Sequence, residues 1–197
     1  MNAFLFIDGS NLYGGQYELF GPDYYLKVNL LIQYIEKNIN VNFSKIFIYG
    51  SYSPIPSRPT KKQKSQLKNE GLFYKSIRHI DNAIFFKGYR SSTSGKEKEV
   101  DVKLAVDIVD MLHRDMFDDL YLFSGDADFM HALTIVKAKK KPITILALQN
   151  RIPFRFIHHF STIIFGEEKL LRKHSVLKKA KKVIFTPIIW EAILGRI

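Results

Sequence analysis

Residues 3–11 read AFLFIDGSN, five apolar residues followed by an aspartate and the turn-forming pair Gly9 and Ser10. An uninterrupted apolar run of this length is typical of a strand buried on both faces, as in parallel sheets. Asp8 would then stand where the strand ends, and open α/β sheets bind their ligands at the carboxyl ends of strands. Asp-Gly is also common turn chemistry, so this pair alone fits a ligand site and a plain turn equally well.

Similar apolar runs recur along the chain and alternate with segments of helical period. The predicted strands are residues 3–8, 45–50, 83–89, 120–124, 143–147 and 162–165. Apolar residues recur at helical spacing within residues 28–35, 100–112 and 129–136. A proline-rich loop at 54–59 leads into a basic helix at 61–70, and residues 90–98 form a polar loop. The order predicts an α/β fold in which helices wrap a parallel sheet.

The composition restricts the class of protein. A chain of 197 residues with 46% hydrophobic and 25% charged residues can bury one sizeable core, so one domain is expected. The absence of cysteine excludes disulfides, thiolate catalysis and cysteine-bound zinc or iron–sulfur sites. No apolar stretch approaches the roughly 20 residues of a membrane span, and the run Ala3–Ile7 is too short for a signal peptide. We therefore expect a cytoplasmic protein with no membrane partner.

The charge of the chain is uneven. Its net charge of +11 favours a polyanionic partner. Residues 58–103 hold twelve basic and five acidic residues, and residues 137–197 hold fourteen and three, whereas residues 104–136 hold one basic and seven acidic residues. Any single lysine-rich run reads more simply as a solvated face. Carboxylates gathered between basic segments would repel a phosphate ligand unless a divalent cation lay between them.

Further carboxylates fall at the expected edge of the sheet. Asp126 and Asp128 lie in LFSGDADF (122–129), directly after a predicted strand, and Asp101 begins the helix that follows the polar loop. Helix capping would explain one of the first two. Asp107 and Asp110 are rotated away from Asp101 along the helix, so we expect them on a solvent face.

Convergence of Asp8, Asp101, Asp126 and Asp128 would require a compensating cation, because several close carboxylates cannot all stay ionised. Ligands that are all oxygen indicate Mg²⁺ or Mn²⁺, and the six histidines show no metal-ligand spacing. A metal held by carboxylates beside basic segments suits phosphodiester hydrolysis.

The C-terminal segment, residues 166–197, is basic and ends in a predicted helix that begins at Thr186 and Pro187. Packing on the core, a contact in a homodimer and a nucleic-acid-binding arm all remain open for it. The burial of Trp190 distinguishes the first from the others.

Three blocks of this sequence resemble the signature blocks of NYN domains, the LabA-like branch of the PIN-like nuclease superfamily. They are Asp8-Gly9-Ser10-Asn11, then Lys98-Glu99-Val100-Asp101, and then Ser124-Gly125-Asp126-Ala127-Asp128-Phe129. The resemblance covers residues 1–165. One departure is Glu99, where the family usually has glycine.

The resemblance implies a PIN-like three-layer α/β/α sandwich with a mostly parallel sheet and a metal-dependent ribonuclease site. Its acidic residues would be Asp8, Asp101, Asp126 and Asp128, with Asn11 and Ser124 holding the ligands or the water. We expect cleavage of single-stranded RNA, and the candidate phosphate contacts are Lys61, Lys62, Lys64, Arg90, Lys96 and Lys98. Candidate stacking platforms for a base are Tyr13, Tyr89 and Phe129.

Two alternatives belong to other classes of protein. An RNA-binding or adaptor module could keep the fold without turnover, and its RNA affinity would then depend on salt and not on a chelator. A phosphatase of the haloacid dehalogenase type also begins with a strand ending in Asp, but it expects a second Asp two residues later, where this chain has Ser10.

Overall fold

The structure is a computed structural model that describes residues 2–90, 97–172 and 178–197. Seven strands form a central sheet in which every neighbouring pair is parallel. From one edge to the other these are β10 (Lys181–Ile184), β9 (Ser161–Gly166), β8 (Ile143–Leu148), β7 (Asp119–Phe123), β1 (Ala3–Asp8), β3 (Phe43–Gly50) and β4 (Ala83–Lys87). The sheet is parallel because each strand is reached by a crossover that passes over one of its faces.

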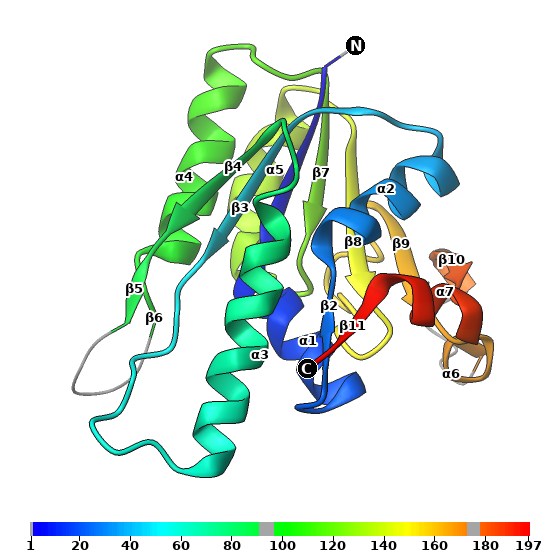
Figure 1. Cartoon of the computed structure of the whole chain (residues 1–197). Helices are drawn as coiled ribbons and strands as arrows, with labels where there is room; N and C mark the ends of the chain where they lie inside the picture. The colour runs from blue at the N-terminus through cyan, green and yellow to red at the C-terminus, as the bar shows by residue number, and fades with distance from the viewer. Residues whose placement is uncertain (1, 91–96, 173–177) are drawn as a thin grey trace.

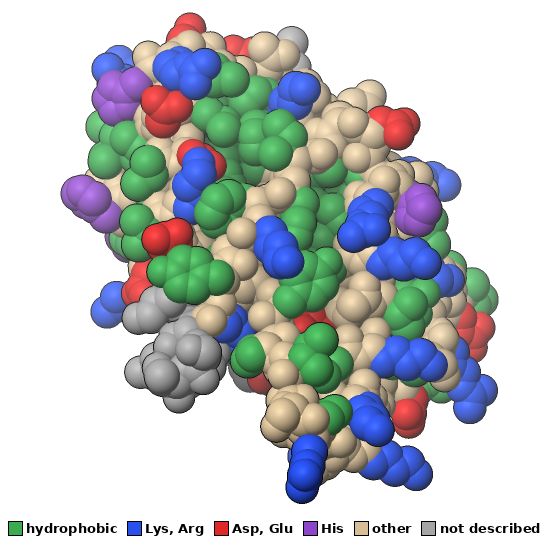
Figure 2. Space-filling model, turned by 60° about the vertical axis from the view of Figure 1, so that its left-hand side comes forward, with side chains coloured by type: hydrophobic (Ala, Val, Ile, Leu, Met, Phe, Trp, Pro, Cys, Tyr) green, Lys and Arg blue, Asp and Glu red, His purple; other side chains and the backbone are tan. Residues whose placement is uncertain are grey.

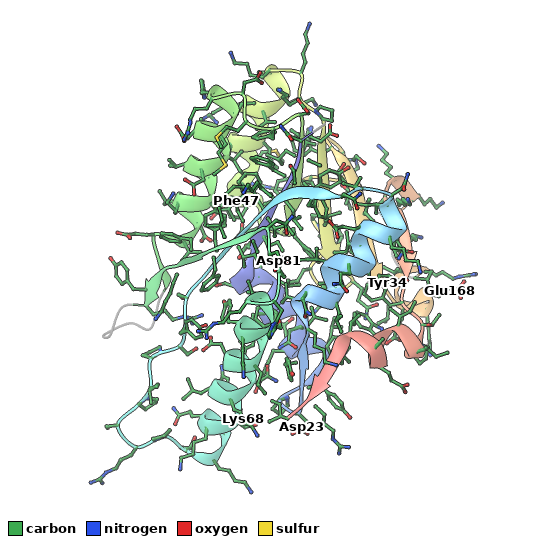
Figure 3. The ribbon with its side chains drawn as sticks, turned by 45° about the horizontal axis from the view of Figure 1, so that its top comes forward. Asp23, Tyr34, Phe47, Lys68, Asp81 and Glu168 are labelled. Atoms are coloured by element: carbon green, nitrogen blue, oxygen red, sulfur yellow. The ribbon has the colours of Figure 1, made fainter. Side chains whose placement is uncertain are left out.

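Helices cover both faces of the sheet (Figure 1). One face packs against α1 (Gly9–Phe20), α2 (Val28–Ile39), α3 (Lys61–Ile77) and α7 (Pro187–Ile193), and the other against α4 (Val100–His113) and α5 (Met130–Ala138). Tyr34 on α2 and Phe47 on β3, both labelled in Figure 3, belong to the hydrophobic cores on opposite faces of the sheet. The predicted three-layer α/β/α sandwich is confirmed.

Two short sheets and two short helices complete the described elements. The pairs are β2 (Tyr24–Leu26) with β11 (Leu194–Arg196) and β5 (Tyr89–Arg90) with β6 (Glu97–Lys98), both antiparallel. The helices are η1 (Ala127–Phe129) and α6 (Glu168–Arg172). In the described parts of the chain, no helix has the length and apolarity that crossing a membrane requires.

The structure departs from the sequence prediction at two helices. α1 follows β1 without a break, although its sequence contains Gly14 and Gly15, which lower helix propensity. α3 continues through Gly71 to Ile77 instead of ending at residue 70, because Phe73, Tyr74 and Ile77 bury their side chains in the core. Tertiary packing therefore overrides the local signals at both places.

The C-terminal segment packs against the rest of the domain. Trp190 is 6% exposed, and its ring meets those of Phe20 and Phe185 with centroids 4.7 and 4.4 Å apart. The prediction of a helical extension is incomplete, because β10 adds an edge strand to the central sheet and β11 pairs with β2. Thr186 caps α7 through its hydroxyl, which accepts a hydrogen bond from the backbone N–H of Ile189 at 3.4 Å.

Candidate active site

Asp8 is the last residue of β1 and the N-cap of α1, so one residue ends a buried strand and starts a helix. Its side chain is 3% exposed. Oδ1 accepts a hydrogen bond from the backbone N–H of Asn11 at 2.9 Å, and Oδ2 accepts one from the hydroxyl of Ser124 at 2.9 Å. These two hydrogen bonds fix the carboxylate between the first turn of α1 and the residue that follows β7.

Ser124 joins the carboxylate of Asp8 to the backbone of Asp126. It follows β7, is fully buried, and its Oγ accepts a hydrogen bond from the backbone N–H of Asp126 at 3.0 Å. Asp126 in turn caps η1, because its Oδ1 accepts from the backbone N–H of Asp128 at 3.0 Å. Residues more than a hundred positions apart are thus linked in one chain of hydrogen bonds, which we call the Asp8–Asp126 chain.

Asn11 links the two turns, and a glycine in each turn allows close packing against a neighbouring backbone. The side-chain oxygen of Asn11 accepts a hydrogen bond from the backbone N–H of Gly125 at 3.3 Å. A Cβ at Gly9 would lie 2.6 Å from the carbonyl oxygen of Tyr49, and one at Gly125 would lie 2.4 Å from the carbonyl oxygen of Arg151. A larger residue at either position would clash with a backbone carbonyl, so glycine lets the first turn pack against the end of β3 and the second against the segment after β8.

Asp101 lies on a helix that packs against the opposite face of the sheet from α1. It is exposed in the first turn of α4, which begins beside the β5–β6 pair (Figure 1). The residue before the helix, Glu99, has φ 68° and ψ −18°, the left-handed conformation that favours glycine. The backbone therefore keeps the conformation that suits glycine although the residue is glutamate.

The prediction that Asp107 faces solvent is wrong. Asp107 is half-buried, and its Oδ2 accepts a hydrogen bond from the hydroxyl of Tyr49 at 2.8 Å, while Lys103 forms an ion pair with its other oxygen. Burial and this hydrogen bond raise the pKa of Tyr49 far above its ordinary value. Asp110, by contrast, is exposed as predicted and pairs with Arg114. Asp107 thus fastens α4 to β3, one turn and a half from Asp101.

The donor set fits a hard cation in its chemistry. The second oxygen of Asp126 and both oxygens of Asp128 accept no hydrogen bond from the described residues, so these oxygens are available to a ligand. Carboxylate oxygens are the donors that Mg²⁺ and Mn²⁺ prefer. Within residues 2–90, 97–172 and 178–197, no group of three or more His, Cys, Asp or Glu side chains is arranged to hold a metal ion. The four-carboxylate site therefore stays a prediction.

The basic candidates are placed as follows. Lys61, Lys62 and Lys64 are exposed in the first turn of α3. The Nε of Arg90 donates to the hydroxyl of Ser51 at 2.9 Å, which fixes its guanidinium beside the end of β3. Lys96 lies outside the described residues, and Lys98 is placed only as backbone of β6.

Of the proposed stacking platforms, only Tyr89 is open, at 56% exposed. Phe129 is 1% exposed and Tyr13 is 7% exposed, so both rings belong to the core. The Tyr13 hydroxyl donates to the carbonyl of Gln66 at 3.3 Å, and burial raises the pKa of Tyr13 well above its usual range.

Sequence reasoning missed Arg151, which follows β8 at the same edge. Its side chain packs on the open faces of Gly14 and Gly15 and forms an ion pair with Glu18 at 2.6 Å. The paired glycines were the available signal, because two adjacent helical glycines leave room for a large neighbouring side chain. The backbone of Arg151 lies against the turn that carries Gly125, while its guanidinium lies on α1.

Comparison with known proteins agrees with the fold. The family model described as the NYN domain matches residues 2–167. The fold is similar to the crystal structure of a protein of unknown function from Vibrio parahaemolyticus, with a TM-score of 0.56, 16% identity, and 83% of this chain and 91% of that chain covered. No curated protein matches the sequence of the chain.

Proposed function

The chain belongs to the NYN domain family, and from this premise we propose that it is a metal-dependent ribonuclease that hydrolyses phosphodiester bonds of single-stranded RNA. The family has a PIN-like, nuclease-type fold, so RNA hydrolysis is its general chemistry. The Asp8–Asp126 chain is the observation that carries the proposal, because it links the end of β1 to the turn after β7 at the edge where α/β sheets bind ligands.

The family resemblance suggests the metal-binding roles, and the contacts of Ser124 and Asn11 support theirs. Asp8, Asp101 and Asp126 would hold one or two Mg²⁺ or Mn²⁺ ions directly, and Asp128 would bind through water or orient the nucleophile. Ser124 holds Asp8 and the backbone of Asp126 at once, and Asn11 holds the Gly125 turn. A bound ion would lower the pKa of a water molecule and offset the charge on the leaving oxygen.

The basic residues serve the binding of the RNA strand. Lys61, Lys62 and Lys64 are exposed on the first turn of α3 and would contact phosphates outside the scissile bond, together with Arg90, Lys96 and Lys98. Their positive charge gives binding a steep dependence on salt. The six cations therefore determine affinity, whereas the carboxylates determine cleavage.

The decisive experiment replaces Asp126 by Asn and measures Mn²⁺-stimulated cleavage of an unstructured RNA on a denaturing gel. We expect cleavage to be abolished, while the melting temperature stays at or above that of the wild type, because one of several close negative charges has been removed. The matched control is Asp81→Asn at an exposed carboxylate just before β4, which leaves cleavage unchanged.

Full cleavage by the Asp126→Asn variant would reject the proposed site. Salt-dependent RNA binding by the wild type that ignores EDTA, with no shortened product at any metal concentration, would identify a binding module instead of an enzyme.

A further inference from the structure

A groove of about 850 Å³ lies between α3 and the edge strand β4, outside the residues assigned above. Its walls come from the segment after β3, from one face of α3 and from β4. We call it the α3–β4 groove. Figure 2 shows this side of the molecule, where exposed hydrophobic side chains adjoin a column of Lys and Arg side chains over α3. Lys68, labelled in Figure 3, marks the same helix.

Aromatic rings form the apolar part of the groove. The ring of Tyr52 lies with its centroid 4.9 Å from that of Tyr74 and 6.4 Å from that of Phe85. Tyr52 and Phe85 are only partly buried, unlike Tyr74. A flat, partly exposed ring is the surface on which unpaired nucleobases stack, whatever their sequence.

Cations surround these rings. The Nζ of Lys87 lies 5.2 Å from the centroid of the Tyr52 ring. The Arg78 guanidinium is close enough to Tyr52 to oppose the rise in its pKa that burial causes. Lys75, Arg78 and Lys87 are exposed and form no ion pair within the described parts of the chain. Their charges are therefore free to meet phosphates.

Glu70 is the only carboxylate among the described residues that line the groove, and its oxygens bind neighbouring protein groups. It is 2% exposed and accepts hydrogen bonds from the backbone N–H and the hydroxyl of Ser53 at 2.8 and 3.0 Å. The guanidinium of Arg90 lies 3.9 Å from it. The groove thus presents a net positive charge to a ligand.

One wall of the groove is continuous with the strand beside Asp8. In the sheet, Asp8 is paired with Tyr49, so the chain from Gly50 to Ser53 leaves β3 beside the carboxylate of Asp8. Arg90 joins the two places, because it donates to Ser51 and faces Glu70. An RNA strand with its scissile bond at the Asp8–Asp126 chain can therefore continue into the groove.

We propose that the α3–β4 groove is a subsite for a flanking nucleotide of single-stranded RNA, with the base against Tyr52 and Phe85 and the backbone phosphates on Lys75, Arg78 and Lys87. The identity of the strand as a substrate rests on the proposed function. The occupant is a nucleic acid because the groove combines stackable rings with three free cations, whereas a purely apolar partner would leave those cations without counter-charge.

The test measures the affinity of the full chain for a fluorescent RNA 12-mer in EDTA, which separates binding from cleavage. One abasic nucleotide is moved through the oligonucleotide, position by position. In the wild type, one position loses about 5- to 100-fold in affinity, the range for loss of one stacked base. In Tyr52→Leu this position-specific loss falls below about twofold, and Tyr52→Phe, which keeps the ring, retains it.

A second pair of variants tests the cations and does not depend on the folding of Tyr52→Leu. The triple variant Lys75→Gln, Arg78→Gln, Lys87→Gln lowers the slope of log affinity against log salt by about two, the value for three phosphate contacts on a single strand. The matched control removes three exposed lysines elsewhere on the chain and leaves the slope unchanged. These are Lys37, Lys45 and Lys169.

The outcomes separate this inference from the proposed function. A wild type that never cleaves RNA but shows the Tyr52-dependent abasic position supports the groove and rejects the nuclease. A wild type that cleaves, with no position whose loss depends on Tyr52 and no change of salt slope in the triple variant, overturns the groove and leaves the nuclease standing. A Tyr52→Leu variant that turns a dimer into a monomer in light scattering, with RNA binding intact, also overturns it.

Discussion

Two networks of polar side chains in this molecule differ in burial: one is fully buried, and the other runs from a buried residue to an exposed one. In the first, the neutral network, Gln16 and Asn69 are both fully buried, and their amides are joined at 3.1 Å. Gln16 also accepts from the backbone N–H of Leu26 at 3.1 Å, and Asn69 donates to the carbonyls of Pro22 and Tyr24 at 3.0 and 2.6 Å. The Gln16–Asn69 bond joins α1 to α3, and the other three bonds hold the segment around β2 against these helices.

The Asp8–Asp126 chain is the second network. It contains carboxylates, and the exposure of its residues increases along it. Asp8 and Ser124 are buried, Asp126 is half-buried, and Asp128 is exposed. The neutral network ends on backbone groups, whereas this chain ends on carboxylate oxygens that the described residues leave unbonded. A network closed on itself stabilises the fold, and one that ends in open acceptors is arranged for a ligand.

The sharpest way to break this comparison is Asp8→Asn. Asparagine is an equally good N-cap, so the fold should persist, but the negative charge at the strand end is lost. We expect RNA cleavage at saturating Mn²⁺ to fall roughly 10²- to 10³-fold, the range for removal of one strong electrostatic contact in an active site. Single-turnover cleavage measures this, and a loss of under about fivefold would place Asp8 in the structural class with Asn69.

The next largest effect is on the neutral network, through Asn69→Ala. The change leaves the Gln16 amide and two carbonyls without their partner inside the protein, so the free energy of unfolding should fall by about 3 kcal/mol. Urea denaturation measures it. Asn38→Ala is the matched control, because Asn38 is exposed and makes one bond to the carbonyl of Tyr34 at 2.8 Å. Below the melting transition, the cleavage rate of Asn69→Ala per folded molecule should equal that of the wild type.

The sheet was predictable from sequence because its strands are continuous apolar runs, which few other structures explain. The strands found at residues 3–8, 83–87 and 143–148 lie at or within two residues of the predicted ones. α1 was not predicted, since its pair of glycines weakens the helical pattern and its burial against Arg151 is a tertiary effect. Short strands such as β10 gain their place only through pairing with β9.

The candidate site was predictable only where it depends on strand ends. Asp8 and Asp126 follow strands, so topology alone brings them to one edge. The prediction for Asp107 was wrong because its position around the helix does not reveal that the hydroxyl of Tyr49, on β3, donates a hydrogen bond to it. The α3–β4 groove was missed for the same reason, since its residues come from three elements that only the tertiary structure brings together.

A pair of serines sharpens the comparison at a smaller scale. Ser124→Ala and Ser76→Ala each remove one buried hydroxyl that both donates and accepts. We expect each to lower the free energy of unfolding by about 1–2 kcal/mol. Only Ser124→Ala should also slow cleavage, by about tenfold, because Asp8 loses a donor that orients it. Equal activity of the two variants would show that Ser124 is an ordinary buried hydroxyl with no part in catalysis.

The smallest expected effect concerns the start of α4, through Glu99→Gly. In the left-handed region, a residue with a Cβ destabilises the folded state by about 1–2 kcal/mol, and glycine removes this strain. Glycine also raises the entropy of the unfolded chain, which offsets roughly 0.5–1 kcal/mol of the gain. The free energy of unfolding should therefore rise by up to about 1 kcal/mol, measured by urea denaturation. Glu99→Ala keeps the Cβ and removes only the charge, so it should gain nothing.

Lys140→Gly is the control that separates an effect of Glu99→Gly on stability from an effect on cleavage. Lys140 also has a positive φ, 58°, but it follows α5 at the far end from Asp101. It should gain similar stability and leave cleavage untouched. If Glu99→Gly alone changes the cleavage rate, the backbone at residue 99 sets the position of Asp101, and the start of α4 then belongs with the Asp8–Asp126 chain. If neither variant changes it, the strain at Glu99 is tolerated and unrelated to catalysis, because a helix fixed to β3 through Asp107 and Tyr49 keeps its place without it.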